Sequence, residues 1–196
     1  MVEPADEARL VERAKSDPAA FGELYERYVR RIYNYIYYRT GNDHDAEDLT
    51  ARVFFRALEN IDRYTVRGLP FSAWLYRIAH NLVANWHRDR SRQKISPLDD
   101  LVARSLWAEA PEALAEGREE RDRLLIAIRR LPDERQQLLL LKFVERMSNA
   151  EIGLVIGRSE GAVKSLYHRT LLSLRDDLGT PPPNGRVMPP TGEADS

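Results

Sequence analysis

Four polar side chains near the C-terminus have the types and spacing needed to read DNA. They are Lys164, Ser165, His168 and Arg169. Residues three and four apart share one face of a helix, so these four are expected to form a single surface. Their donors can reach base edges or phosphates, and a recognition helix enters the major groove by its N-terminal residues. The spacing therefore predicts a groove-facing helix.

The residues before this helix predict a helix-turn-helix. Ser148 or Asn149 can cap a first helix, and Gly157 supplies the positive φ that a tight turn needs. Gly153 is small where the second helix must cross closely, and Ser159 can cap that second helix. The inward positions expected are Ile152, Val155, Ile156, Val163, Leu166 or Tyr167, Leu171, Leu174 and Leu178. An ordinary helical hairpin is the alternative, but the polar-basic face favours DNA binding.

Catalytic chemistry has weaker support in the sequence. The candidate metal ligands are His44, Asp45, Glu47 and Asp48 in one segment, and His80 and His87 in another. Metal sites on helices need histidines at i and i+4 with a third ligand, and neither group provides them. The sequence also has no phosphate loop, no nucleophile motif and no cysteine. We therefore expect no enzyme activity, no metal and no cofactor.

Charge is segregated along the chain although the formal net charge is only −1. Basic residues gather in 75–94 and again in 158–175, whereas acidic residues gather at the N-terminus and in 98–122. Two basic patches separated by an acidic connector suit a protein that touches nucleic acid at two places. Solvated helix faces are the alternative for either patch alone.

Length and composition indicate a soluble chain of two small domains. The 196 residues are 43% hydrophobic, which is enough for packed cores. No run approaches the roughly 20 apolar residues that span a bilayer, and the charged N-terminus lacks a signal-peptide segment. With no cysteine in the chain, we expect a cytoplasmic protein with no membrane insertion.

The elements expected are all helical. A first apolar stripe comprises Phe21, Leu24, Tyr25, Tyr28, Ile32, Tyr35 and Ile36. Asp43 or Asp45 can cap a second helix over 46–60, whose inner side is expected to carry Leu49, Val53, Phe54, Ala57, Leu58 and Ile61. A loop over 62–70 precedes a third helix, with Trp74, Leu75, Ile78, Ala79, Leu82, Val83 and Trp86 facing inward.

We therefore predict an all-α protein of two small helical domains joined by a flexible linker, the C-terminal one containing the helix-turn-helix. An N-terminal segment over 1–17 precedes the first domain at 18–92. An acidic linker over 93–118 contains a short helix near 101–107, and the second domain occupies 119–178. Proline-rich residues 179–196 form a disordered tail.

Two separated segments resemble the extracytoplasmic-function (ECF, group 4) sigma factors of bacterial RNA polymerase. The first is Asp-Ala-Glu-Asp-Leu-Thr at 45–50 with Val53-Phe54, followed by Phe-Ser-Ala-Trp-Leu-Tyr-Arg-Ile-Ala-His-Asn at 71–81. The second runs from Leu131-Pro132 through the helix-turn-helix. Together they cover about three-quarters of the chain in family order. The resemblance implies an alternative sigma factor that directs promoter-specific transcription initiation.

The resemblance also implies that the first domain binds core polymerase and the −10 element. The helix bearing Asp48, Leu49, Thr50, Val53 and Phe54 would bind the β′ coiled coil, although the apolar members could be plain core. Ala51-Arg52 replaces the family's usual Gln-Glu. The loop over 63–70 would hold an extruded base of the −10 strand, which needs stacking surface and edge hydrogen bonds. Tyr64 and Asn81 would supply these, and Arg77, Arg88 and Arg90 would hold phosphates. For Trp74, core packing is favoured.

The second domain would read the −35 element as duplex through Lys164, Ser165, His168 and Arg169, and would contact the polymerase β flap. Leu166 and Arg158 depart from the family pattern and suggest altered phosphate anchoring or promoter choice. Family members are commonly held inactive by an anti-sigma factor. The competing reading is a helix-turn-helix repressor, which would not need the first domain.

Overall fold

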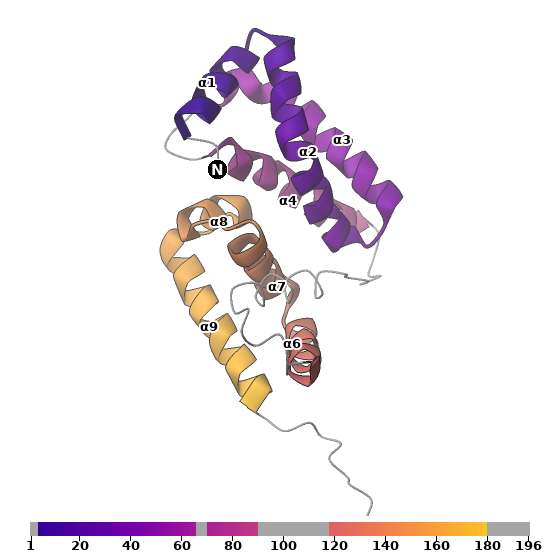
Figure 1. Cartoon of the computed structure of the whole chain (residues 1–196), viewed down its shortest axis with the longest axis vertical. Coiled ribbons are helices and arrows are strands. Elements are labelled where there is room, and N and C mark those ends of the chain that lie inside the picture. Colours follow the sequence, from indigo (N-terminus) through magenta and orange to yellow (C-terminus); the bar gives the residue numbers. More distant parts are fainter. Residues whose placement is uncertain (1–3, 66–69, 90–117, 180–196) are drawn as a thin grey trace, which may run out of the picture.

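The chain forms two helical units that lie against each other (Figure 1). The structure, a computed structural model, describes residues 4–65, 70–89 and 118–179. These ranges contain helices and turns but no strand, which confirms the all-α prediction. The expected short helix near 101–107, loop residues 66–69 and the tail from 180 lie outside the described residues.

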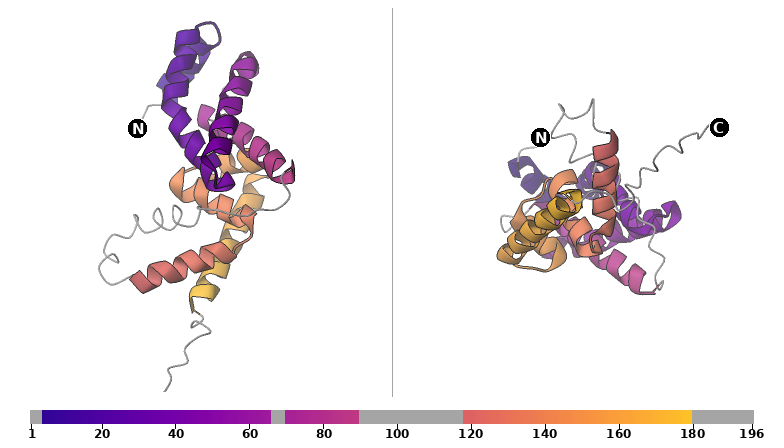
Figure 2. Two further views of the ribbon diagram at one scale, coloured as in Figure 1. Left: turned by 90° about the vertical axis from the view of Figure 1, so that its right-hand side faces the viewer. Right: turned by 90° about the horizontal axis from the view of Figure 1, so that it is seen from below.

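The first unit, indigo to magenta in Figure 1, precedes residue 90 and the second, orange to yellow, follows residue 117. The first consists of α1 (Pro4–Ala14), α2 (Pro18–Thr40), α3 (Asp43–Asn60), the 3₁₀ turn η1 (Ile61–Arg63) and α4 (Phe71–Asp89). The second consists of α6 (Arg118–Arg130), α7 (Asp133–Leu139), the π-helical turn η3 (Leu140–Val144), α8 (Asn149–Ile156) and α9 (Glu160–Gly179). Figure 2 shows the two units from two further directions.

Local capping explains where the long helices of the first unit begin and end. The Asp17 carboxylate accepts a hydrogen bond from the Ala19 N–H at 2.9 Å, and Pro18 fits the first turn of α2. Gly41 ends α2 with φ 65°, in the left-handed region. Asn42 then caps α3 by accepting from the Asp45 N–H at 3.0 Å. The expected caps, Asp43 or Asp45, instead lie inside α3, which begins three residues earlier than predicted.

Helix α1 occupies the segment that the sequence left outside the first domain. It packs against α2 and α4, and it buries Leu10, Val11 and Ala14. One carboxylate oxygen of Glu7 accepts a hydrogen bond from the Phe71 N–H at 2.8 Å, and the other accepts from the Tyr28 hydroxyl. Because the first N–H groups of a helix have no partner within it, Glu7 acts as a cap for α4 supplied from a distant part of the chain.

Three residues expected in the core are exposed. Tyr25, Leu58 and Leu171 have 43%, 49% and 41% of their surface accessible. In α9 the inward position is taken by Thr170, which is fully buried. Its hydroxyl can be buried at low cost because it donates a hydrogen bond to the Leu166 carbonyl at 2.8 Å. A residue next to an inward position is rotated by about 100°, so Leu171 turns outward.

Candidate nucleic-acid interface

The helix-turn-helix is formed by α8 and α9, and its first helix is capped at both ends. The Glu151 N–H donates to the Ser148 hydroxyl at 3.2 Å, while the Ser148 N–H donates to the Glu151 carboxylate at 2.6 Å. This reciprocal pair is a capping box. Gly157 ends α8 with φ 71° and ψ 35°. The predictions of a cap at Ser148 and a positive φ at Gly157 are confirmed.

The turn also depends on Gly153, although its close neighbour is the turn backbone and not the second helix. A Cβ atom on Gly153 would lie 2.5 Å from the Arg158 carbonyl oxygen. The Arg158 N–H donates to the Gly153 carbonyl at 2.8 Å, which holds the two backbones together. The close approach is therefore part of the turn, and only glycine leaves room for it.

The predicted reading face of α9 is open to solvent. Lys164, Ser165, His168 and Arg169 are all exposed, whereas Val163 and Leu166 are buried on the other side of the helix. Lys164 Nζ lies 2.9 Å from Glu160, and Arg169 Nε donates to the Ser165 carbonyl at 3.3 Å. These are exposed contacts that groove binding can replace at low cost. The structure therefore brings the four side chains together.

The two departures from the family pattern in the second unit, Leu166 and Arg158, have local structural roles. Leu166 packs in the core with 4% of its surface accessible, so its side chain does not face the groove. Arg158, in the turn, forms an ion pair with Glu134 of α7 at 2.5 Å. That pair ties the turn to the rest of the second unit.

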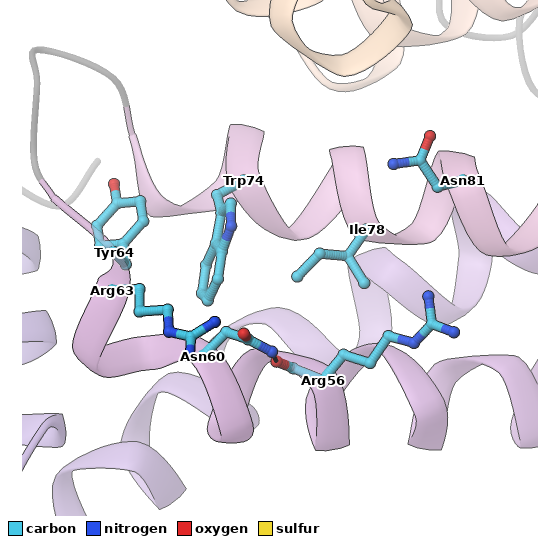
Figure 3. A pocket seen from close by; sticks show the side chains of 7 residues that line it. All are labelled: Arg56, Asn60, Arg63, Tyr64, Trp74, Ile78 and Asn81. Carbon is cyan, nitrogen blue, oxygen red and sulfur yellow. Dashed lines mark hydrogen bonds between the residues drawn. The ribbon is translucent and has the colours of Figure 1, made fainter.

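A pocket of about 320 Å³ lies between α3, η1 and α4 in the first unit. Its lining residues are Arg56, Asn60, Arg63, Tyr64, Trp74, Ile78 and Asn81. Figure 3 shows the Tyr64 and Trp74 rings close together at one end and Asn81 at the other. Two aromatic faces with an amide beyond them can stack on a planar group and hydrogen-bond its edge.

The aromatic end of the pocket is held by ring contacts. The Tyr64 ring centroid lies 5.0 Å from Trp74 and 5.4 Å from Phe71. Burial, with a smaller contribution from Glu7, raises the pKa of Tyr64 to about 12, so its hydroxyl keeps its proton at neutral pH. Trp74 is half-buried and packs against the core, as the sequence favoured, while its remaining surface lines the pocket.

The basic residues near the pocket follow α4. Arg77 and Arg88 are exposed, and Arg88 lies two helical turns beyond Asn81, about 10 Å along the axis. Arg90 lies outside the described residues. Sequence reasoning missed Arg56 and Asn60, which enter the pocket from α3. The sequence signal that could have identified them is their spacing of four residues just before the loop, which places both on the side of α3 that meets the loop.

The helix expected to bind polymerase presents a different set of side chains from the one predicted. Leu49, Thr50, Val53 and Phe54 are buried, and the Thr50 hydroxyl donates to the Ala46 carbonyl at 2.6 Å. Among the predicted residues, Asp48 is exposed and pairs with Arg52 at 2.9 Å. The exposed apolar groups nearby are Tyr25, Phe55 and Leu58.

The part of the chain that the structure describes contains neither a metal-binding cluster nor a membrane-spanning helix. It holds no group of three or more histidine, aspartate or glutamate side chains that could bind a metal ion. None of its helices is both long and apolar enough to cross a membrane.

Comparisons with known proteins find matches to both helical units. The family models Sigma-70 region 2 and Sigma-70 region 4 match residues 24–93 and 121–174. The ECF RNA polymerase sigma factor SigW of Bacillus subtilis is 32% identical over 180 residues, which cover 87% of this chain and 95% of SigW. The chain belongs to the ECF sigma factors. It is an alternative sigma factor for promoter-specific transcription initiation.

Other relatives of this sigma factor support the same family. BldN of Streptomyces coelicolor is 40% identical over 175 residues, and the match covers 87% of this chain but 66% of BldN, just under two thirds. Among solved structures, CnrH in complex with the cytosolic domain of CnrY is similar with a TM-score of 0.61 at 22% identity, covering 87% of this chain and 95% of CnrH. At that identity the likeness shows the fold alone.

Proposed function

We propose that this sigma factor reads a promoter at two places with two kinds of chemistry. The second unit reads the −35 element as duplex, and the first unit holds an extruded base of the −10 strand. The pocket between Tyr64 and Asn81 carries the proposal, because a repressor that binds only duplex has no use for it. The role is one of recognition in the cytoplasm and not of catalysis.

At the −35 element, the reading face of α9 enters the major groove. Arg169 and Lys164 supply guanidinium and ammonium donors, and Ser165 and His168 supply shorter polar groups. Arginine pairs well with guanine edges, whereas lysine and serine also bind phosphate. The solvent exposure of all four side chains supports this assignment.

At the −10 element, one base leaves the stack and enters the pocket. Extrusion costs a few kcal/mol, which stacking on Tyr64 and Trp74 offsets. Asn81 offers a donor and an acceptor to the edge of the base. Arg77 and Arg88, with Arg90 beyond them, hold the phosphates of the strand.

Core polymerase binds the outer face of α3. Asp48 supplies the carboxylate for the β′ coiled coil, and the buried residues Leu49, Thr50, Val53 and Phe54 support the helix from within. Phe55 and Leu58 provide apolar surface that the sequence assignment lacked. The second unit contacts the β flap. An anti-sigma factor is the proposed inhibitor, and it would compete for these surfaces.

A binding comparison tests the proposal. The purified chain is expected to bind core polymerase tightly and isolated promoter duplex weakly, measured by fluorescence anisotropy at a fixed salt concentration. Much of the −10 site is single-stranded only in the open complex, which explains the weak duplex binding. Strong sequence-specific binding to duplex with no association to core polymerase would favour a repressor instead.

The two basic sites should respond differently to mutation. Arg169→Ala is expected to reduce run-off transcription according to the −35 sequence, with a loss of about 1–3 kcal/mol at promoters whose guanine it contacts. Arg88→Ala is expected to weaken all promoters similarly and to lower the salt dependence, because it contacts phosphate. A promoter library with varied −35 elements measures both. Identical sequence profiles for the two variants would contradict this division.

A further inference from the structure

The start of α4 is held by a side chain from the N-terminal helix. Glu7 of α1 is half-buried, and one oxygen of its carboxylate accepts a hydrogen bond from the Phe71 N–H at 2.8 Å. Pro70, the residue before α4, has a side chain with no hydrogen-bond acceptor. Because the positive end of the helix dipole lies at the N-terminus, a carboxylate there stabilises the first turn. The Glu7 carboxylate therefore helps to fix where α4 begins.

The second oxygen of the Glu7 carboxylate ties the same point to α2. It accepts a hydrogen bond from the hydroxyl of Tyr28, a buried residue. Burial, together with this hydrogen bond, raises the pKa of Tyr28 well above its ordinary value, so the hydroxyl keeps its proton and remains a donor. The ring centroids of Tyr28 and Phe71 lie 6.0 Å apart. Glu7 therefore holds two aromatic residues from two helices in a fixed relation.

Phe71 connects this constraint to the pocket. Its buried ring is not among the lining residues, but its centroid lies 5.4 Å from Tyr64 and 5.3 Å from Trp74, which both line the pocket. Protein interiors are close-packed, so a shift of the Phe71 ring must move its neighbours. The path from Glu7 to the stacking surface therefore consists of one hydrogen bond and one layer of ring contacts.

The helix that carries Glu7 is itself anchored. Leu10 and Val11 are buried, and α1 packs against both α2 and α4. An acceptor on a packed helix has little conformational freedom left to lose when it binds an N–H, so the hydrogen bond to Phe71 is formed at low entropic cost. The carboxylate is therefore presented to α4 by a rigid element of the first unit.

We propose that Glu7 is a positioning residue of the −10 pocket. Through Phe71 it keeps the rings of Tyr64 and Trp74 in the arrangement that accepts an extruded base, and it does not touch the base itself. A carboxylate would repel the phosphates of the strand, which argues against a direct contact with DNA. The inference rests on the proposed role of the pocket in holding a base of the −10 strand.

Hydrogen exchange at the Phe71 amide tests the first step in the free chain. Glu7→Ala removes the acceptor, so the Phe71 amide proton should exchange about tenfold faster, measured by NMR of the ¹⁵N-labelled chain. Glu7→Gln keeps an acceptor oxygen for Phe71 and should stay within about threefold of the unmodified rate. Glu12→Ala removes an exposed carboxylate of the same helix, which pairs with Lys15, and should leave the rate unchanged.

Promoter opening in the complex with core polymerase tests the second step. A 2-aminopurine at the −10 position that leaves the stack becomes more fluorescent as the base is extruded. Glu7→Ala should lower the rate of this increase by roughly three- to tenfold, and Glu7→Gln should restore it to within about twofold. Glu12→Ala makes the same change in net charge and should open promoters at the unmodified rate, which separates the local effect from general electrostatics.

Two further variants separate positioning from stability. If Glu7 acts through the stacking surface, Glu7→Ala should change the opening rate by less than about twofold in a chain that already carries Tyr64→Ala. Leu10→Ala leaves a cavity under α1 but keeps the Glu7 carboxylate, so it should lower the melting temperature without slowing promoter opening. Melting of every variant by circular dichroism verifies that the first unit is folded at the temperature of the assay.

The inference and the proposed function fail in different ways. The inference is overturned if Glu7→Ala leaves the Phe71 exchange rate unchanged, or if it slows opening equally with and without Tyr64→Ala. It is also overturned if Glu7→Ala opens promoters at the unmodified rate while Tyr64→Ala is impaired. Equal opening rates for Tyr64→Ala and the unmodified chain would instead contradict the proposed pocket, and faster exchange at Phe71 would still show that Glu7 fixes the start of α4.

Discussion

Replacing Gly153 with alanine is expected to destabilise the second unit by about 1–3 kcal/mol, as overpacking of a tight site does. The added Cβ would lie 2.5 Å from the Arg158 carbonyl oxygen, which belongs to the backbone and cannot move aside like a side-chain end. Helix propensity opposes this loss by at most about 1 kcal/mol. Thermal melting should show the change, at about 4–8 °C per kcal/mol for a unit of this size.

Gly161→Ala is the matched control within the same motif. Nothing lies within 4 Å of the position a Cβ would take on Gly161, so alanine there should be neutral or stabilising by up to about 1 kcal/mol. Gly153→Ala should also reduce discrimination among −35 sequences, because the turn sets the angle at which α9 leaves α8. Equal melting temperatures for the two variants would show that the turn can relax around the added methyl group.

Replacing Tyr64 with alanine is expected to reduce open-complex formation by roughly ten- to a hundredfold. Loss of one base–aromatic stack costs about 1–3 kcal/mol, and 1.4 kcal/mol is tenfold. A 2-aminopurine at the −10 position that leaves the stack should lose part of its fluorescence increase on promoter opening. Binding to core polymerase should be unchanged, since the pocket and the outer face of α3 are separate surfaces.

Tyr64→Phe separates stacking from the hydroxyl. It keeps the ring next to Trp74 and Phe71, so open-complex formation should stay within about threefold of the unmodified chain. Because burial can make any truncation here destabilising, melting of the first unit is measured alongside. If Tyr64→Ala and the unmodified chain give the same 2-aminopurine signal, the extruded base does not use this pocket.

Local sequence patterns were sufficient to predict the helix-turn-helix and some of the residues that line the pocket. Ser148 and Gly157 act through neighbours three or four residues away, and such short-range chemistry is visible in a sequence. Tyr64 and Asn81 were found through the resemblance, whereas Arg56 and Asn60 join the pocket only because α3 and α4 pack side by side.

Long-range contacts explain what the sequence left out. Glu7 and Phe71 are 64 positions apart, and Gln137 and Tyr35 are 102 apart, so neither pairing leaves a local pattern. Thr170 and Leu171 were interchanged because periodicity assigns the more apolar residue inward. Periodicity does not take into account that a threonine hydroxyl can hydrogen-bond to a carbonyl of its own helix, which lowers the free-energy cost of burying it. Leu58 is exposed for a different reason: its neighbour Ala57, also expected inward, holds the buried position.

The contacts of α1 show that the boundary of the folded unit differs from the boundary of the family match. The region 2 match begins at residue 24, but the structure buries side chains from Leu10 onward and caps α4 with Glu7. Removing the first 17 residues would uncover apolar surface on α2 and α4 and leave the Phe71 N–H without its acceptor. The cooperative folding unit is therefore larger than the region 2 match, and a change in α1 can shift the start of α4, and with it the pocket, without altering any residue that lines the pocket.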